Sequence, residues 1–166
     1  HAYHEQLGIL KEFIHDLDFV NMEPHNDLPK SGGIITSVSP SGIEVRCLAD
    51  EGNQYAVYVE GGSIVYLNFD LPAGSYTAEW INTKQRGSNG EIIIEKTQSF
   101  THNGGIKSLG SPNYTENDIA LRITNDLTTG NSDTGLRAHW KLDDGSGNTA
   151  LDYSNNSNTG TLLNNP

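Results

Sequence analysis

The chain opens with apolar residues repeated at helical spacing. Leu7, Leu10, Ile14 and Leu17 recur at steps of three and four residues, so they form one stripe along a helix. The pattern predicts a single amphipathic helix over residues 4–17. We expect its stripe to be buried against the rest of the protein or against another chain, because exposing several large aliphatic side chains is unfavourable.

From about residue 34 to residue 124 the apolar positions alternate with a period of two, which is typical of strands. Gly, Pro and Asn residues separate the alternating runs, and these residues mark turns. The candidate strands are Ile34–Val38, Ile43–Ala49, Tyr55–Glu60, Ser63–Phe69, Ser75–Asn82, Glu91–Phe100 and Asp118–Thr124. The pattern predicts an all-β antiparallel sandwich of about seven strands, preceded by one amphipathic α-helix.

Two glycine-containing turns set the expected strand pairing. Gly61-Gly62 joins two alternating runs, and glycine tolerates the positive φ that tight hairpin turns require. Pro72-Ala73-Gly74 predicts a second turn. Residues 55–82 are therefore expected to form a three-stranded antiparallel meander.

The alternating pattern stops after residue 124. Residues 125–135 are polar and without periodicity, which is typical of a linker. Residues 136–166 carry too few apolar side chains for an independent core. We expect this tail to add nothing essential to the fold of residues 28–124, and if it packs, Trp140 and Leu142 are the expected anchors.

Charge and cysteine content exclude several function classes. The formal net charge is -11, which opposes binding to nucleic acid or to anionic membranes. No apolar run approaches the roughly 20 residues of a membrane-spanning helix, and residue 1 opens no signal peptide. Cys47 is the sole cysteine, so no intrachain disulfide or cysteine-rich metal site forms. Abundant Asn, Ser, Thr and Gly favour a secreted bacterial protein.

Two motifs give a first resemblance. Tyr55-Ala56-Val57-Tyr58 is followed by a strand pair and then by Trp80-Ile81-Asn82-Thr83-Lys84-Gln85-Arg86-Gly87. This order resembles the β-sandwich that follows the (β/α)₈ barrel in bacterial glycoside hydrolases, a module also described as collagen-binding. Thr83 stands where that family usually has Pro, and one extra residue precedes Gly87. The resemblance implies that residues 1–27 are the linking helix from an upstream barrel and residues 28–124 an accessory sandwich.

A second resemblance lies in the tail. Residues 135–160, with His139-Trp140-Lys141-Leu142-Asp143-Asp144-Gly145 near their start, are similar to the opening of a laminin G-like, concanavalin-type lectin domain. The resemblance implies that residues 136–166 are the truncated start of such a domain, so lectin function does not transfer to this chain. Calcium is expected only in a complete parent domain, where the candidate ligands are Asp143, Asp144, Asp152 and Asn155. The favoured alternative is that these residues only form turns, as oxygen-rich segments usually do.

Neither catalysis nor a cofactor is expected of the chain itself. Glu79, Glu91 and Glu95 lie in alternating runs whose outward face is normally charged, and surface carboxylates are rarely catalytic. Glycosidases need two carboxylates across a cleft, and a parent enzyme would carry them upstream of residue 1. We therefore expect no catalytic residue, metal or cofactor here.

Aromatic residues are the candidates for sugar binding, because sugars stack on flat exposed rings. Tyr58, Tyr66 and either Tyr76 or Trp80 occupy neighbouring predicted strands and would align across a sheet. Packing in the core is the favoured alternative for them, since large aromatics dominate sandwich cores. Tyr114, in the long loop 101–117, is the better candidate for an exposed ring.

These observations lead to three functional hypotheses. The first is a non-catalytic accessory sandwich of a secreted glycoside hydrolase, which supports the upstream (β/α)₈ domain and helps to hold polysaccharide. The second is a free-standing carbohydrate-binding module. The third is a structural or adhesive module that binds protein, or copies of itself, through exposed sheet edges.

Overall fold

The computed structural model describes residues 2–25, 33–126, 149–150 and 158–161. The chain divides into two compact units, His1–Asp126 and Leu127–Pro166. The described part of the second unit contains one short antiparallel pair, β8 (Thr149–Ala150) with β9 (Gly160–Thr161). Trp140 and Leu142, as well as the four tail residues named above as calcium ligands, lie outside the described residues.

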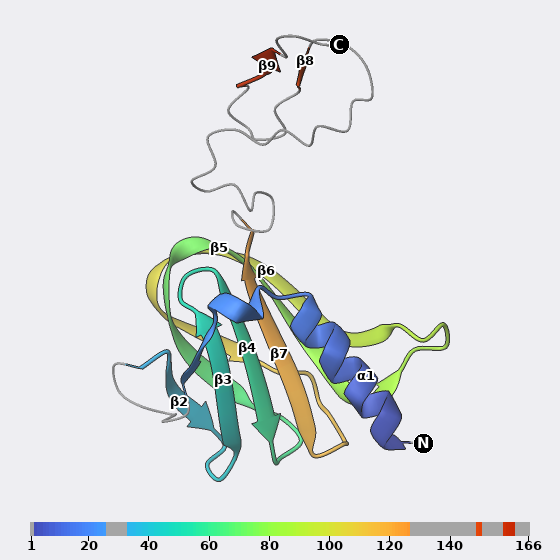
Figure 1. Cartoon of the computed structure of the whole chain (residues 1–166). Coiled ribbons are helices and arrows are strands. Elements are labelled where there is room, and N and C mark those ends of the chain that lie inside the picture. The colour runs from blue at the N-terminus through green and yellow to red at the C-terminus, as the bar shows by residue number, and fades with distance from the viewer. Residues whose placement is uncertain (1, 26–32, 127–148, 151–157, 162–166) are drawn as a thin grey trace. The chain divides into compact units, whose positions relative to one another are not determined.

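The first unit holds one helix and seven strands among its described residues. The helix α1 spans Ala2–His15 and is followed by the short 3₁₀ helix η1, Phe19–Asn21. The strands are β1 (Glu23–His25), β2 (Ile35–Ser39), β3 (Glu44–Asp50), β4 (Gln54–Glu60), β5 (Tyr66–Arg86), β6 (Ile92–Gly110) and β7 (Asp118–Asn125). All pairings are antiparallel, which confirms the expected fold class (Figure 1).

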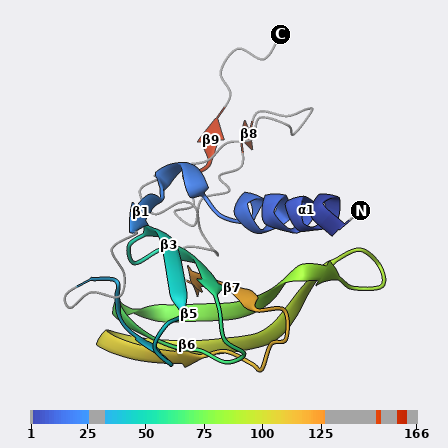
Figure 2. The same cartoon turned by 90° about the horizontal axis from the view of Figure 1, so that it is seen from below.

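The sheet curls because two strands run through both of its layers. Its order is β1-β3-β4-β7-β5-β2, with β6 paired to β5. The first part of β5, Tyr66–Phe69, pairs with β2, whereas Tyr76–Ile81 pairs with β7. β6 accompanies β5 through the bend, and Figure 2 shows the two strands curving together beneath the helix. The result is a sandwich-like fold made from one continuous sheet.

The main core lies between the two layers. Alternate residues of β4 and β5 point into it, as the period of two predicts. Phe69, in the first part of β5, meets Tyr55 of β4 edge-on with ring centroids 6.3 Å apart. The largest fully buried side chains include Trp80, Tyr55, Tyr76, Phe69, Leu67, Leu71, Leu109 and Leu121.

The expected meander over residues 55–82 is wrong. Gly61 and Gly62 do have positive φ values, 103° and 75°, yet β4 pairs with β3 and β7 and makes no ladder with β5. The two glycines instead carry the chain across the core, so that Phe69 faces Tyr55 from the opposite layer. This connection buries both apolar faces against each other, whereas a hairpin would leave them side by side in one layer.

The predicted turn at Pro72-Ala73-Gly74 is also absent, because β5 continues through these residues. Between Phe69 and Tyr76 neither β2 nor β7 pairs with β5, so among the described residues this edge of β5 has no ladder partner where Pro72 lacks an N–H donor. The Tyr76 hydroxyl donates a hydrogen bond to the Pro72 carbonyl oxygen at 3.1 Å. A Cβ on Gly74 would lie 2.9 Å from Asn125 Nδ2 and 3.0 Å from the Tyr76 ring, so a larger residue there would have to displace these side chains.

The helix forms as predicted but buries a different face. Ile9, Phe13 and Leu17 are buried, while Leu7 and Leu10 are 62% and 55% exposed. The sheet of this chain therefore does not bury Leu7 and Leu10, and their burial against another chain or domain stays a prediction. The apolar surface of α1 is broader than one stripe, and the sheet covers only the side that carries Ile9 and Phe13.

Candidate functional site

Helix α1 is fixed to the sheet by ion pairs along one flank. Arg86 Nη1 lies 2.7 Å from Glu12 Oε2, and the backbone N–H of Arg86 donates to Glu5 Oε1 at 3.2 Å. Arg122 Nη1 lies 2.6 Å from Asp16 Oδ2. Because both arginines come from central strands, β5 and β7, these contacts set the direction of the helix across the sheet.

Beneath the helix lies a second, smaller apolar cluster. Phe13, Leu17 and Met22 pack on Ala56, Ile81 and Ala120, which lie on β4, β5 and β7. The two alanines leave room for the helix to approach the sheet closely. Each of these strand residues occupies the face opposite the main core, so the outer face of the sheet is apolar where the helix covers it.

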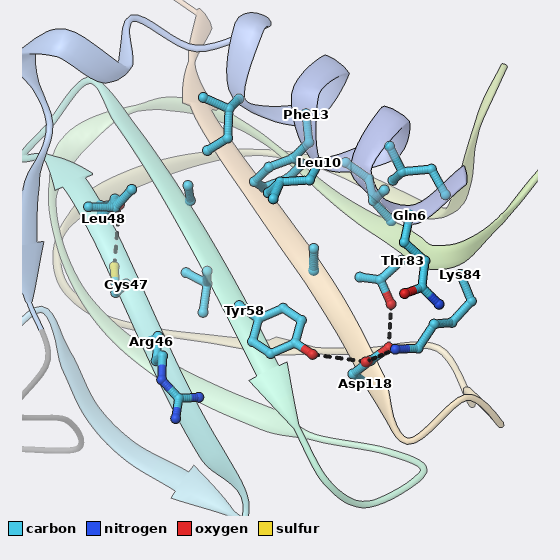
Figure 3. A pocket seen from close by; sticks show the side chains of 16 residues that line it. Gln6, Leu10, Phe13, Arg46, Cys47, Leu48, Tyr58, Thr83, Lys84 and Asp118 are labelled. Carbon is cyan, nitrogen blue, oxygen red and sulfur yellow. Dashed lines mark hydrogen bonds and ion pairs between the residues drawn. The ribbon is translucent and has the colours of Figure 1, made fainter. Parts of the chain in front are cut away.

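A cavity of about 340 Å³ opens on the other flank of the helix. Leu10 and Phe13 of the helix line it on one side, and Leu48 of β3 lies on the sheet side (Figure 3). Ile14 and Ala56 also line it. Its body is apolar, and its polar groups gather at one end. This composition is typical of sites that take an apolar group with a polar end, or the side chains of another domain.

The polar end is organised around the carboxylate of Asp118, which is 7% exposed. Tyr58 donates its hydroxyl to Asp118 Oδ2 at 2.8 Å. Thr83 donates to Oδ1, and the Lys84 ammonium forms an ion pair with Oδ2. Figure 3 shows these four side chains converging from β4, β5 and β7.

Electrostatics make this cluster a poor acid–base site. Burial acts to raise the pKa of Asp118, but hydrogen bonds from Lys84, Thr83 and Tyr58 outweigh it and hold that pKa below its usual value. Burial and the hydrogen bond to Asp118 raise the pKa of Tyr58 to about 12. A general acid or base works best with a pKa near the working pH. The arrangement therefore suits binding and support rather than proton transfer.

The structure separates the aromatic residues that the sequence put forward for sugar binding. Tyr76 and Trp80 are fully buried, so they are core residues and cannot stack on a sugar. Tyr114 is 7% exposed and donates its hydroxyl to the Gly61 carbonyl oxygen at 2.6 Å, which corrects the expectation of an exposed ring. Residues 101–110 of the expected loop belong to β6, so the loop is confined to residues 111–117. Within it, the Tyr114 N–H donates to the Ser63 carbonyl oxygen at 2.9 Å, beside the β4–β5 connection.

Tyr58 and Tyr66 remain accessible, at 37% and 50% exposure. They do not form one platform, because Tyr58 lies on β4 between β3 and β7. Tyr66 pairs with Ser39 of β2 and Gly110 of β6 in the other layer. A role for either ring in sugar binding stays a prediction.

The residues of the polar cluster other than Tyr58 were not identified from the sequence. The alternation of residues 118–124 places Asp118, Ala120 and Arg122 on one face. Only the pairing of β4 with β7, which sets Tyr58 opposite Ala120, brings Tyr58 next to Asp118. In the sequence, Thr83 stood out only because it occupies a position where the resembled family usually has Pro.

Other site types find no support among the residues that the structure covers. No group of three or more His, Cys, Asp or Glu side chains there is arranged to hold a metal ion. Cys47 is buried, and burial raises the pKa of its thiol to about 12. Within the same residues, no helix is long and apolar enough to cross a membrane.

Comparisons with known proteins show a likeness to a solved structure. No protein family matches the chain, and no curated protein matches it either. Among solved structures, the chain is similar to one described as "Glycoside hydrolase", with a TM-score of 0.48 and 15% sequence identity. The alignment covers 74% of this chain and 25% of that chain. The chain therefore spans about a quarter of that protein, whose activity is not transferred to it.

Proposed function

We propose that this chain is a non-catalytic accessory β-sandwich of a secreted carbohydrate-active enzyme, packed against a (β/α)₈ glycoside hydrolase domain that precedes it. The two family resemblances found in the sequence support the proposal that the chain belongs to a secreted carbohydrate-active enzyme. The observation that carries the proposal is the two-sided apolar surface of α1. One side is buried on the sheet through Ile9 and Phe13, while Leu7 and Leu10 stay exposed.

This arrangement fits a helix that lies between two domains. A helix that is apolar over more than one face is normally covered on more than one side. Leu10 lines the cavity over β3 and β4, so a neighbouring domain that covers Leu10 also closes the cavity. The ion pairs of Glu12 and Asp16 hold the opposite flank, which leaves the apolar flank free for the partner.

The test uses the longer gene product that includes the preceding domain. The double variant Leu7→Asp/Leu10→Asp is expected to lower the melting temperature of the longer protein, because it places two charges in the domain interface. The same substitutions are expected to leave this chain alone nearly unchanged, since both side chains are exposed in it. His4→Asp, at an exposed position of the same helix, is the matched control. An unchanged melting temperature of the longer double variant contradicts the proposal.

A second measurement concerns catalysis. The purified chain is expected to show no hydrolysis of polysaccharides or aryl glycosides, because the proposed acid and base lie in the preceding domain. Turnover that survives stringent purification and disappears when one carboxylate is changed would show that the chain is itself an enzyme.

A different observation favours self-association as a second candidate function. Within the described residues, β6 pairs only with β5, so the other edge of this 19-residue strand carries unpaired backbone groups. Ile94 and Ile106 on β6 are 44% and 56% exposed. Edges of this kind accept a further strand. Sedimentation of the wild type and of Thr97→Pro tests it: a dimer that the proline abolishes supports pairing through β6, and a monomeric wild type excludes it.

A further inference from the structure

A second cavity lies beside a bulge at the end of β5. Ile81 pairs with Ile94 and Arg86 pairs with Ile92, so the four residues 82–85 stand opposite the single residue Ile93. Asn82 Oδ1 accepts hydrogen bonds from the backbone N–H groups of Lys84 and Gln85, both at 2.9 Å. Bulges re-aim side chains and occur often next to functional sites. Figure 1 shows this end of β5 and β6 extending beyond the rest of the sheet.

The bulge divides its side chains between two cavities. Thr83 and Lys84 reach Asp118 at the end of the first cavity. Asn82 and Gln85 line the second, which has a volume of about 280 Å³. Glu95 of β6, and Asn113 and Glu116 of the loop before β7, add further polar groups to its wall. None of these five residues takes part in the contacts that hold the helix.

The wall of the second cavity presents planar hydrogen-bonding groups rather than apolar surface. Asn82 Nδ2 donates to Glu95 Oε1 at 2.9 Å, and Gln85 Nε2 lies 3.5 Å from Glu116 Oε1. The carboxylates accept hydrogen bonds, whereas the amides of Gln85 and Asn113 both donate and accept. A ligand with hydroxyl groups, each a donor and an acceptor, matches this mixed set.

Charge narrows the class of ligand further. Glu95 and Glu116 make the wall negative. The third carboxylate at this cavity, Asp118, is balanced by its ion pair with Lys84. An acidic sugar is repelled by such a wall. A metal ion is not favoured either, since no three metal-binding side chains come together in the part of the chain that the structure describes. The volume is close to the roughly 300 Å³ lower end of small-molecule sites, which suits a short stretch of a glycan.

We infer that this polar cavity binds a neutral carbohydrate through its hydroxyl groups, with Gln85 and Asn113 as the main donors and Glu95 and Glu116 as acceptors. The choice of carbohydrate as the ligand class rests on the proposed function. This cavity is then the place where the accessory sandwich holds polysaccharide. Tyr114, which the sequence singled out as a sugar-binding ring, lies at this cavity and acts here as a wall.

The test is a titration of the isotope-labelled chain with cellohexaose, xylohexaose and mannohexaose, followed by nuclear magnetic resonance of the side-chain amides. At least one neutral oligosaccharide is expected to shift the amide signals of Asn82, Gln85 and Asn113, and polygalacturonate is expected to shift none. Gln85→Ala and Asn113→Ala are each expected to weaken binding about tenfold, the effect of losing roughly one hydrogen bond to ligand. The control is Asn103→Ala, an exposed amide on β6 that does not line the cavity.

Two outcomes of the titration would overturn the proposed carbohydrate site. No amide shift with any of the three oligosaccharides at millimolar concentration overturns this inference, while the contact with a preceding domain is judged separately by the melting temperatures described above. Binding that survives Gln85→Ala and Asn113→Ala but is lost in Tyr58→Ala or Tyr66→Ala also overturns it. That second outcome leaves a carbohydrate-binding sandwich with its site on an exposed ring.

Discussion

Arg122 and Asp16 are 106 positions apart in the chain, yet Arg122 Nη1 donates to Asp16 Oδ2 at 2.6 Å. The same guanidinium donates through Nη2 to Glu79 Oε2 at 2.8 Å. It thus joins α1 to β7 and β5 at once. The side chain of Arg122 is 14% exposed and that of Glu79 is 20% exposed, so solvent screens this pair less than a surface ion pair.

Arg122→Ala is expected to lower the free energy of unfolding by about 2 kcal/mol, because it leaves the carboxylate of Glu79 without its partner in a half-buried place. Urea denaturation measures the change. Arg46→Ala is the matched control, since Arg46 pairs with Glu44 and Glu60 on an exposed surface and such pairs contribute about 0–1 kcal/mol. Equal losses for the two variants would show that the Arg122 contacts do not fix the helix.

Asp118 predicts a dependence of stability on pH. Its pKa in the folded protein lies below the ordinary value of 3.8, so its contribution is present above that value and is lost as the pH falls through the folded pKa. Asp118→Asn is expected to be less stable than the wild type by about 2 kcal/mol near neutral pH, with a smaller difference near pH ~3. Urea midpoints across this range measure it.

The control for that series is Asp70→Asn, which removes the same charge from an exposed position. It is expected to change the free energy of unfolding by less than about 0.5 kcal/mol. A difference between wild type and Asp118→Asn that stays constant down to low pH would contradict the role given to the Asp118 carboxylate.

Cys47 reports on global unfolding. Its side chain faces the main core at 2% exposure, and burial raises the pKa of its thiol to about 12. The thiolate is the reactive form, so the native chain is expected to react with Ellman's reagent only as fast as it unfolds. The check compares the modification rate in buffer with the rate in urea above the unfolding midpoint. Fast modification in buffer would mean that β3 opens locally.

The tail prediction is tested by truncation after Asp126. This end point keeps Asn125, whose side-chain amide donates to the Gly52 carbonyl oxygen at 2.8 Å. The truncated chain is expected to melt within a few degrees of the full chain, because ordering a polar tail opposes folding by roughly 1–2 kcal/mol per residue. A drop of many degrees, or the loss of an assembly, would show that residues 127–166 are structural.

Local features of the fold followed from the sequence alone. The period-two runs place Tyr55 and Val57 in the core, and the structure buries both at 0–1% exposure. The helix predicted over residues 4–17 spans Ala2–His15, and the strand predicted at Asp118–Thr124 is β7, Asp118–Asn125. These features depend on neighbours within a few positions, because the direction of a side chain in a strand or helix is set by the local backbone.

Strand pairing and the faces of α1 were decided by contacts between distant residues. The turn residues at 72–74 read as a chain reversal, yet β5 continues because its bend closes the core over Tyr76. Leu7, Leu10 and Ile9 are alike as sequence. Which of them is buried depends on the ion pairs of Arg86 and Arg122 and on the packing of Phe13 against the sheet.

In the candidate sites, too, local sequence predicted the residue types, and tertiary contacts decided which residues lie together. The sequence supplied tyrosines with the right chemistry for sugars, but whether a ring lies in the core or at the surface depends on which layer its strand joins. The cluster around Asp118 draws Tyr58 from β4 and Thr83 and Lys84 from the β5 bulge, at sequence separations that no local pattern spans. The sequence by itself determined the class of fold, the presence of the helix and the alternation of side chains along most strands, but not that β5 runs unbroken from Tyr66 to Arg86. Tertiary packing alone decided which side chains meet, because burying both faces of a curled sheet selects one pairing among many with equally good alternation.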